Sequence, residues 1–265
     1  MRSGLVFIHI PKAAGTSLRE VIARQYPPDV QLATDAPITL TAEQRRRVRV
    51  LVGHVPFGAQ AQLASPVQVI TMLRHPVDRV VSLYYYVRCR PNHPLGPYVH
   101  GRSLEWFASC GLSQVSNDQV RQIGGGDPLS LDVATHNLIT GTAAFGLAER
   151  FDESLVLMQQ AIGWRHIHHR RLNVTDRPPE RELPRAALAR IERENALDME
   201  LHAVARAEFA ERIERQGEQF AHALRRLRRL NPAYAAVSTQ LHAGVRVIPT
   251  PIRHALSRAL AFFRQ

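Results

Sequence analysis

The sequence predicts an α/β fold in which a central parallel β-sheet is flanked by helices. Three short apolar runs, GLVFIHI (4–10), RVRVLVGHV (47–55) and VQVITML (67–73), are typical of strands buried on both faces of a parallel sheet. Amphipathic segments follow the first and third runs. Strands that alternate with helices in this way favour a parallel sheet.

A tight loop joins the first strand to its helix. The segment GTSLREVIARQY (15–26) has a single apolar face, and Ser17 and Glu20 stand at the spacing of a capping box. The unit is therefore strand, loop and helix, and PKAAG (11–15) forms the loop.

The second and third strands also end in polar residues. The second ends near Val52, which leaves His54 at its carboxyl end, and the third ends at Arg74. The segment RHPVDRVVSLYYYV (74–87) predicts the next helix, because Pro76 suits the first helical position.

The remaining chain predicts a covering loop and a helical end. Residues 90–130 form a long segment rich in proline and glycine, and we expect it to cover the site. Residues 144–164 predict a strand and a helix, and residues 184–230 are strongly helical. We expect one domain over residues 1–235. Residues 236–265 would be a basic amphipathic helical extension docked on it, with contact to a membrane surface as an alternative.

Composition restricts the class of protein. The chain has 265 residues, of which 45% are apolar and 22% charged, and its formal net charge is +11. A charge of this sign indicates an anionic partner without naming it. We expect a soluble cytoplasmic protein, because neither a membrane-spanning run nor a secretory signal is visible. The two cysteines, Cys89 and Cys110, predict unpaired thiols.

Lys12 is the only lysine among 34 lysines and arginines. An arginine side chain ends in a wide planar fork, whereas a lysine ends in a compact ammonium on a thin stem. A lysine kept in a tight loop therefore indicates a slender cation that must approach a small oxyanion closely.

The loop around Lys12 has the character of an anion site. It follows the carboxyl end of a strand, its small residues leave their amide groups accessible, and its hydroxyl groups add donors. The lysine precedes the glycine, unlike in GxxxxGK[ST]. None of the three proposed strands ends in a carboxylate that would hold magnesium, so we expect no metal. The residues of this predicted site are Lys12, Ala13, Ala14, Gly15, Thr16 and Ser17.

Several motifs together resemble one enzyme family. FIHIPKAAGTS (7–17) resembles the 5′-phosphosulfate loop of sulfotransferases that use 3′-phosphoadenosine 5′-phosphosulfate (PAPS), and MLRHPVDRVVSLYYY (72–86) resembles their 3′-phosphate motif. GHVPFG (53–58) is similar to the segment that carries the catalytic histidine in the glycan branch, particularly the uronyl and heparan sulfate 2-O-sulfotransferases. NDQVRQIGG, FGLAERFDESLVLM and RRLNVTDRP continue the likeness, which covers roughly residues 5–220.

The resemblance implies the sulfotransferase version of the P-loop NTPase-like fold and an in-line transfer of a sulfuryl group from PAPS to a hydroxyl of a carbohydrate, which releases 3′-phosphoadenosine 5′-phosphate (PAP). His54 would be the general base, since a neutral imidazole can accept the hydroxyl proton. Lys12 would stabilise the departing phosphate oxygen. The residues implied at the rest of the nucleotide are Arg74 and Ser82 at the 3′-phosphate and Arg171, Asn173 and Thr175 at the adenosine end.

The sequence also departs from the family and leaves alternatives open. His75 stands where many relatives have an aspartate that could cap the following helix, and Arg79 is expected to form a structural ion pair. The membrane anchor of the animal Golgi enzymes is not visible. The alternatives are a nucleotide-dependent kinase of related fold and a non-catalytic binder of an anionic polymer, although we expect no nucleic-acid partner. The neighbouring His166, His168 and His169 are expected to be solvated rather than to bind metal.

Overall fold

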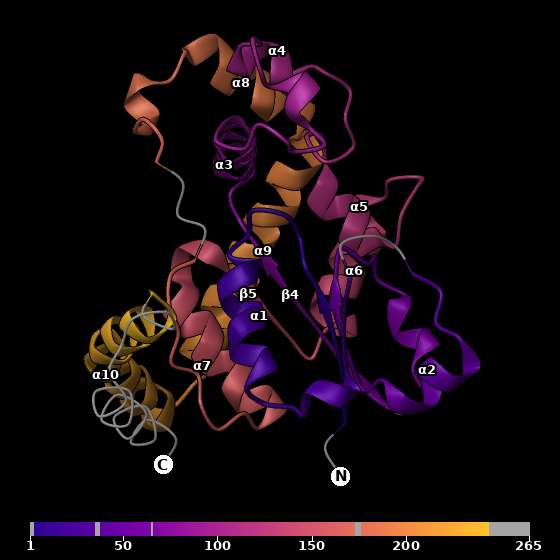
Figure 1. The fold of residues 1–265 in the computed structure, drawn as a ribbon, viewed down its shortest axis with the longest axis vertical. Coiled ribbons are helices and arrows are strands. Elements are labelled where there is room, and N and C mark those ends of the chain that lie inside the picture. Colours follow the sequence, from indigo (N-terminus) through magenta and orange to yellow (C-terminus); the bar gives the residue numbers. More distant parts are fainter. Residues whose placement is uncertain (1–2, 35–37, 65, 173–175, 244–265) are drawn as a thin grey trace.

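The computed structural model describes residues 3–34, 38–64, 66–172 and 176–243 (Figure 1). Its centre is a five-stranded sheet in which all the strand pairs are parallel, in the order β2-β3-β1-β4-β5. The prediction of an α/β fold with a central parallel sheet flanked by helices is confirmed. The strands are β1 (Gly4–Ile8), β2 (Gln31–Thr34), β3 (Val50–Gly53), β4 (Val67–Leu73) and β5 (Ala144–Leu147).

The three strands predicted from apolar runs form the middle of this sheet. Every residue of β1 and of β3 is buried, as expected for strands covered on both faces. The edge strand β2, by contrast, is half-buried to exposed. It was not predicted, because four residues with partial burial leave no continuous apolar run.

Helices cover the sheet and extend beyond one of its ends. Figure 1 shows α3, α4 and α8 gathered at one end of the molecule, where they share an apolar cluster separate from the core around the sheet. The first seven helices are α1 (Gly15–Ala23), α2 (Ala42–Arg47), α3 (Pro76–Arg88), α4 (Leu104–Ala108), α5 (Asp118–Gly124), α6 (Leu131–His136) and α7 (Phe151–Ile162). The last three are α8 (Arg185–Glu194), α9 (Ala196–Glu214) and α10 (Glu218–Ala243).

The predicted helical end of the chain begins with α10, which packs on α7 (Figure 1). This helix continues through residue 235, where the extension was expected to begin. Residues 244–265 lie outside the described part of the chain, so the division at 235 stays a prediction. Across the described ranges, no helix combines the length and the apolar character needed to cross a bilayer.

Candidate functional site

A cavity of about 840 Å³ lies at the carboxyl edge of the sheet. Residues that follow β1, β3, β4 and β5 line it, and residues 93–95 and Gln114 of the long 90–130 segment contribute to its wall, as expected. The predicted site residues that line it are Lys12, Ala14, Gly15, Thr16, Ser17, His54, Arg74, Ser82 and Arg171. Ala13 does not line the cavity, and its buried N–H donates to the Ile10 carbonyl at 3.3 Å. Asn173 and Thr175 lie outside the described residues.

The loop between β1 and α1 has an uncommon backbone. Lys12 has φ 67° and Ala14 has φ 60°, although neither residue is glycine. A left-handed conformation costs such residues about 1–2 kcal/mol each. Ala13 between them is not left-handed, so the handedness alternates along the loop. Successive amides in alternating conformations form a concave nest that binds anions, and the start of α1 adds further donors.

The imidazole of His9 fills the space beneath this loop. A Cβ on Gly15 would lie 2.0 Å from His9 Cδ2, so only glycine fits there. The His9 ring stacks on Phe7 with centroids 5.4 Å apart and meets His54 edge-on at 5.0 Å. Burial, followed by the charges of His54, Arg19 and Lys12, lowers the pKa of His9 to about 3. His9 is therefore a neutral wall of the cavity at neutral pH.

Lys12 points its ammonium at an aromatic ring. Its Nζ lies 3.7 Å from the centroid of Tyr86, and Cζ of Arg90 lies 3.6 Å from the same centroid. Burial, then Arg90 and Arg74, lower the pKa of Lys12 to about 8. At neutral pH Lys12 is thus mostly charged, and it loses its proton far more easily than a solvated lysine does.

Arg74 connects the loop to the start of α3. Its Nη1 donates to the Lys12 carbonyl at 3.1 Å, and its Nη2 lies 3.7 Å from Asp78 Oδ1. Arg177 also pairs with Asp78. Ser82, which lies further along α3, lines the same cavity. The Arg74 guanidinium just before α3 and the Ser82 hydroxyl on α3 are both hydrogen-bond donors at the cavity wall, and donors of this kind bind anions.

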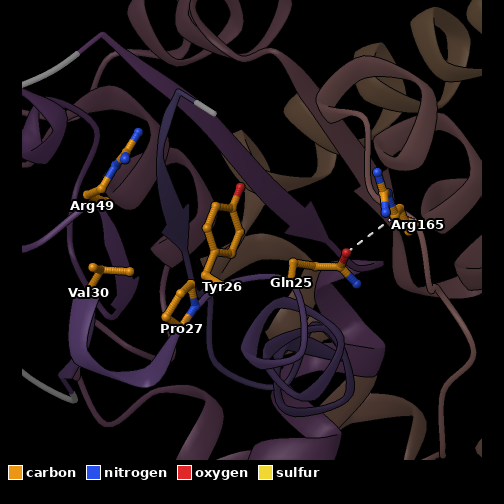
Figure 2. Close-up of a pocket in the computed structure, with 6 residues that line it drawn as sticks. All are labelled: Gln25, Tyr26, Pro27, Val30, Arg49 and Arg165. Carbon is orange, nitrogen blue, oxygen red and sulfur yellow. Dashed lines mark hydrogen bonds between the residues drawn. The ribbon is translucent and has the colours of Figure 1, made fainter. Parts of the chain in front are cut away.

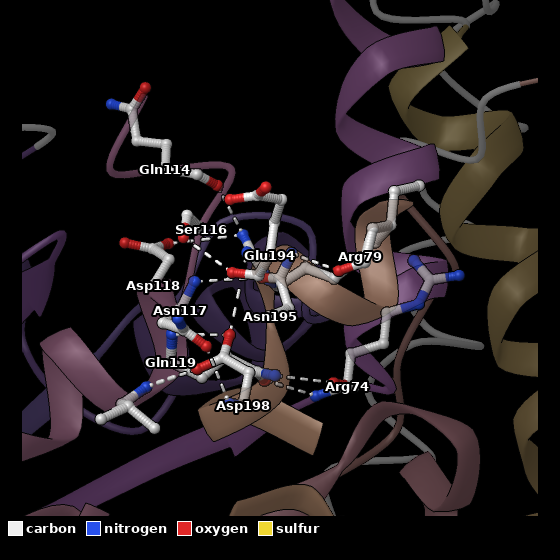
Figure 3. Close-up of polar contacts among 12 residues, drawn as sticks. Arg74, Arg79, Gln114, Ser116, Asn117, Asp118, Gln119, Glu194, Asn195 and Asp198 are labelled. Carbon is white, nitrogen blue, oxygen red and sulfur yellow. Dashed lines mark hydrogen bonds and ion pairs between the residues drawn. The ribbon is translucent and has the colours of Figure 1, made fainter. Parts of the chain in front are cut away.

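A buried polar network holds the backbone of Arg74 (Figure 3). The Gln119 side chain accepts from the Arg74 N–H at 3.0 Å and donates to the Arg74 carbonyl at 2.9 Å. Asp198 in turn accepts from the N–H groups of Gln119 and Val120 at the start of α5, at 3.1 and 2.8 Å. Helices α5 and α9 therefore fix the position of a cavity residue.

Arg79 supplies the positive charge of this network. Its Nη1 lies 3.4 Å from Asp118 Oδ2 and its Nη2 lies 3.9 Å from Asp198 Oδ2, and all three side chains are buried. Burial outweighs the arginine and raises the pKa of Asp198 to about 6. The prediction that Arg79 forms a structural ion pair is confirmed.

Two expectations from the sequence are wrong. Ser17 does not cap α1, because the helix begins at Gly15 and the Ser17 hydroxyl instead accepts from the Leu172 N–H at 3.0 Å. This bond brings Arg171 to the cavity. His169 is buried rather than solvated, since it packs edge-on against Phe151 and lies 3.4 Å from an Asp152 carboxylate oxygen. The arginines that flank the histidines, Arg165 and Arg170, gave no indication of this packing.

Two further features concern metal binding and a second cavity. Among the described residues, no group of three or more His, Cys, Asp or Glu side chains has the geometry to hold a metal ion. A second cavity, of about 290 Å³, is lined by Val30 and Arg49, which immediately precede β2 and β3 (Figure 2). It therefore lies at the amino edge of the sheet, away from the predicted site residues.

The fold and the cavity define an α/β protein with a cavity of basic lining at the carboxyl edge of a parallel sheet. No family model and no curated protein matches the chain. Among solved structures, the chain is similar to mouse sulfotransferase SULT7A1, whose structure is complexed with PAP. The two share 18% identity over 74% of this chain, with a TM-score of 0.37. The similar part spans 64% of the mouse chain.

Sequence reasoning did not identify several residues of the cavity wall. His9 lay inside a predicted strand, and the YYY run did not show which tyrosine faces the loop. Glu149 follows β5, and the residues just after this strand were not considered as candidates for the site. The only available signal was the position of a polar residue just beyond a buried strand, which His9 and Glu149 share.

Proposed function

We propose that this protein is a sulfotransferase that transfers the sulfuryl group of PAPS to a hydroxyl of a carbohydrate. The observation that carries the proposal is one cavity lined by the Lys12 loop, by Arg74 and Ser82, and by the His54 imidazole just beyond β3. PAPS carries anionic groups at both its 5′ and its 3′ positions, which matches this arrangement.

The size and the charge of the cavity also support a nucleotide donor. Its volume of about 840 Å³ is in the range typical of small-molecule sites. Its lining includes five basic side chains, four of which are arginines, whereas Asp78 and Glu149 are its carboxylates. The basic residues are Lys12, Arg19, Arg74, Arg171 and Arg177.

Within this proposal the 5′-phosphosulfate lies in the nest of residues 12–17. The acceptor hydroxyl oxygen attacks sulfur, the bond between sulfur and the bridging phosphate oxygen breaks, and PAP leaves. Lys12 and the loop amides stabilise the charge that develops on this oxygen. His54 accepts the hydroxyl proton, a role that typically contributes about 10² to 10⁴ in rate.

Arg74 and Ser82 are assigned to the 3′-phosphate. A bidentate guanidinium contact is charge-assisted and directional, so it distinguishes PAP from adenosine 5′-monophosphate. Glycan as the acceptor class rests on the GHVPFG segment and the other motifs of the glycan branch.

Calorimetry with PAP and with adenosine 5′-monophosphate tests this proposal. Arg74→Ala should weaken PAP binding by about 10-fold or more and leave the monophosphate nearly unaffected, because a hydrogen bond to a charged group contributes about 1.5–3 kcal/mol. Lys12→Ala should weaken the binding of both PAP and adenosine 5′-monophosphate. Arg88→Ala is the matched control, since it removes one charge from the exposed end of α3, outside the cavity.

His54→Ala should bind PAP like the wild type and lose turnover, measured as PAP release with PAPS and a desulfated uronic-acid polysaccharide. Normal turnover in this variant would show that the base is misassigned. A wild-type protein that does not bind PAP would refute the proposal as a whole. Binding of ATP that depends on magnesium would instead favour a kinase, and Glu149 in the cavity wall makes this a necessary comparison.

A further inference from the structure

The Tyr86 ring is in contact with two cations. Nζ of Lys12 is 3.7 Å and Cζ of Arg90 is 3.6 Å from its centroid. Two like charges this close to one centroid repel each other least when they occupy opposite faces of the ring. Arg90 is held there because its Nη1 also donates to the Tyr86 carbonyl at 3.0 Å.

The ring replaces the carboxylate that usually accompanies a partly buried ammonium. In the described part of the chain no ion pair joins Lys12 to a carboxylate, and the cavity carboxylates already have other partners. Asp78 pairs with Arg74 and Arg177, and Glu149 accepts from the His75 N–H. An aromatic face attracts a cation without neutralising it, so the full charge of Lys12 stays available to an anion in the loop.

We propose that Tyr86 is the positioning residue of Lys12, holding its ammonium at the edge of the loop, and that Arg90 fixes the ring from the other face. This inference rests on the proposed function, because it assigns the held ammonium to the 5′ end of the nucleotide. Tyr86 itself lines the cavity, so the ammonium on its face borders the space that the ligand would enter.

The charges around Lys12 make its protonation sensitive to Arg90. The groups that face it are His9 at the end of β1, Arg74 after β4, and Arg90 and His93 after α3. Two of these are permanent cations, and none is an anion. Burial and these cations lower the pKa of Lys12 to about 8, so removal of Arg90 should raise it.

The single lysine allows a direct test that needs no nucleotide. Reductive methylation with ¹³C-formaldehyde labels Lys12 and the α-amino group only, and the Lys12→Arg variant identifies the Lys12 signal. In the wild type, the ring current of Tyr86 should shift the methyl protons of Lys12 upfield. Tyr86→Phe should keep this shift and Tyr86→Leu should abolish it. Tyr85→Leu, at the adjacent tyrosine outside the cavity lining, should keep it.

Two further measurements test the role in binding. Tyr86→Leu should weaken PAP binding about 3- to 30-fold, as expected for loss of a cation–π contact, while Tyr86→Phe binds like the wild type. Arg90→Gln should move the midpoint of the Lys12 methyl titration to higher pH. These results would support the positioning role.

The outcomes separate this inference from the proposed function. An identical Lys12 shift in the wild type and in Tyr86→Leu overturns the contact, whatever the nucleotide does. A tighter complex of PAP with Tyr86→Leu shows that the ring withholds Lys12 from the ligand, and it overturns the positioning role. If the wild type shows the ring-current shift and does not bind PAP, the contact between Lys12 and Tyr86 is supported. The proposed function then fails, and the role of Tyr86 in nucleotide binding fails with it.

Discussion

Replacement of Gly15 by alanine should destabilise the protein solely because of the His9 ring. The added Cβ would lie 2.0 Å from His9 Cδ2 and 2.2 Å from Nε2, far inside contact distance. The ring has little room to withdraw, because Phe7 lies against its face and His54 against its edge. Overpacking of this kind costs about 1–3 kcal/mol of the free energy of unfolding.

The backbone conformation at Gly15, taken alone, favours alanine over glycine. Gly15 is the first residue of α1 and does not have a positive φ. In a helix, alanine is more favourable than glycine by about 1 kcal/mol. In a His9→Ala background the same substitution should therefore be neutral or stabilising, which gives a coupling of about 1–3 kcal/mol between the two sites.

Urea unfolding of the wild type, both single variants and the double variant measures this coupling as shifts in midpoint at constant m. Gly217→Ala is the matched control, because its Cβ would meet nothing within 4 Å and its φ is not positive. It should be neutral or slightly stabilising. An equal cost of Gly15→Ala in both backgrounds would show that His9 does not set the requirement for glycine, and the geometry of the loop would need revision.

Two further predictions concern buried charges. His9 binds a proton at pH 6.5 when unfolded and only near pH 3 when folded, so stability falls as the pH drops below 6.5. The loss should be about 2 kcal/mol between pH 7.5 and 5, and His9→Phe should remove this part of the pH dependence of urea unfolding. If His9→Phe left the pH dependence of the free energy of unfolding unchanged, the prediction for His9 would be contradicted. Asp198→Asn should cost about 3–5 kcal/mol, because it leaves Arg79 buried with one carboxylate and weakens two backbone hydrogen bonds. Thermal unfolding measures this loss of stability. A loss of stability below about 1 kcal/mol would indicate that Asp118 alone balances the charge of Arg79.

The fold was predictable where burial imposes a pattern on the sequence. Strands β1, β3 and β4 lie in the middle of the sheet, so both faces demand apolar residues and the runs are continuous. Strand β2 has only the pattern QLAT at a partly exposed edge, which a loop could equally show. It pairs with β3 and closely approaches Gly53, where a Cβ would lie 2.1 Å from the Thr34 carbonyl oxygen.

The site was predictable only where one segment carries several of its residues. The Lys12 loop and the Arg74–Ser82 segment each have a recognisable local pattern, and both line the cavity. The contact between Lys12 and Tyr86, however, joins two segments, and helical periodicity gives the face of α3 without the neighbour it meets. The same holds for the Arg79 network, whose carboxylates lie on α5 and α9.

The start of α3 shows how sheet order supplies what the local sequence lacks. His75, at the N-cap position of α3, makes no side-chain cap. Strands β4 and β5 pair with Leu73 opposite Leu147, so His75 and Glu149, each two residues further on, meet at the same edge. The Glu149 carboxylate accepts from the His75 N–H at 2.6 Å.

The Glu149 carboxylate is charged at neutral pH. Burial would raise the pKa of Glu149, but His202 and the His75 N–H together lower it to about 2. An anion at the beginning of a helix is favourable for the exposed amides there. The carboxylate that accepts from the His75 N–H is thus provided by the segment that follows the neighbouring strand β5. A histidine at position 75 is compatible with this helix start because Glu149, two residues beyond the end of β5, accepts from its N–H.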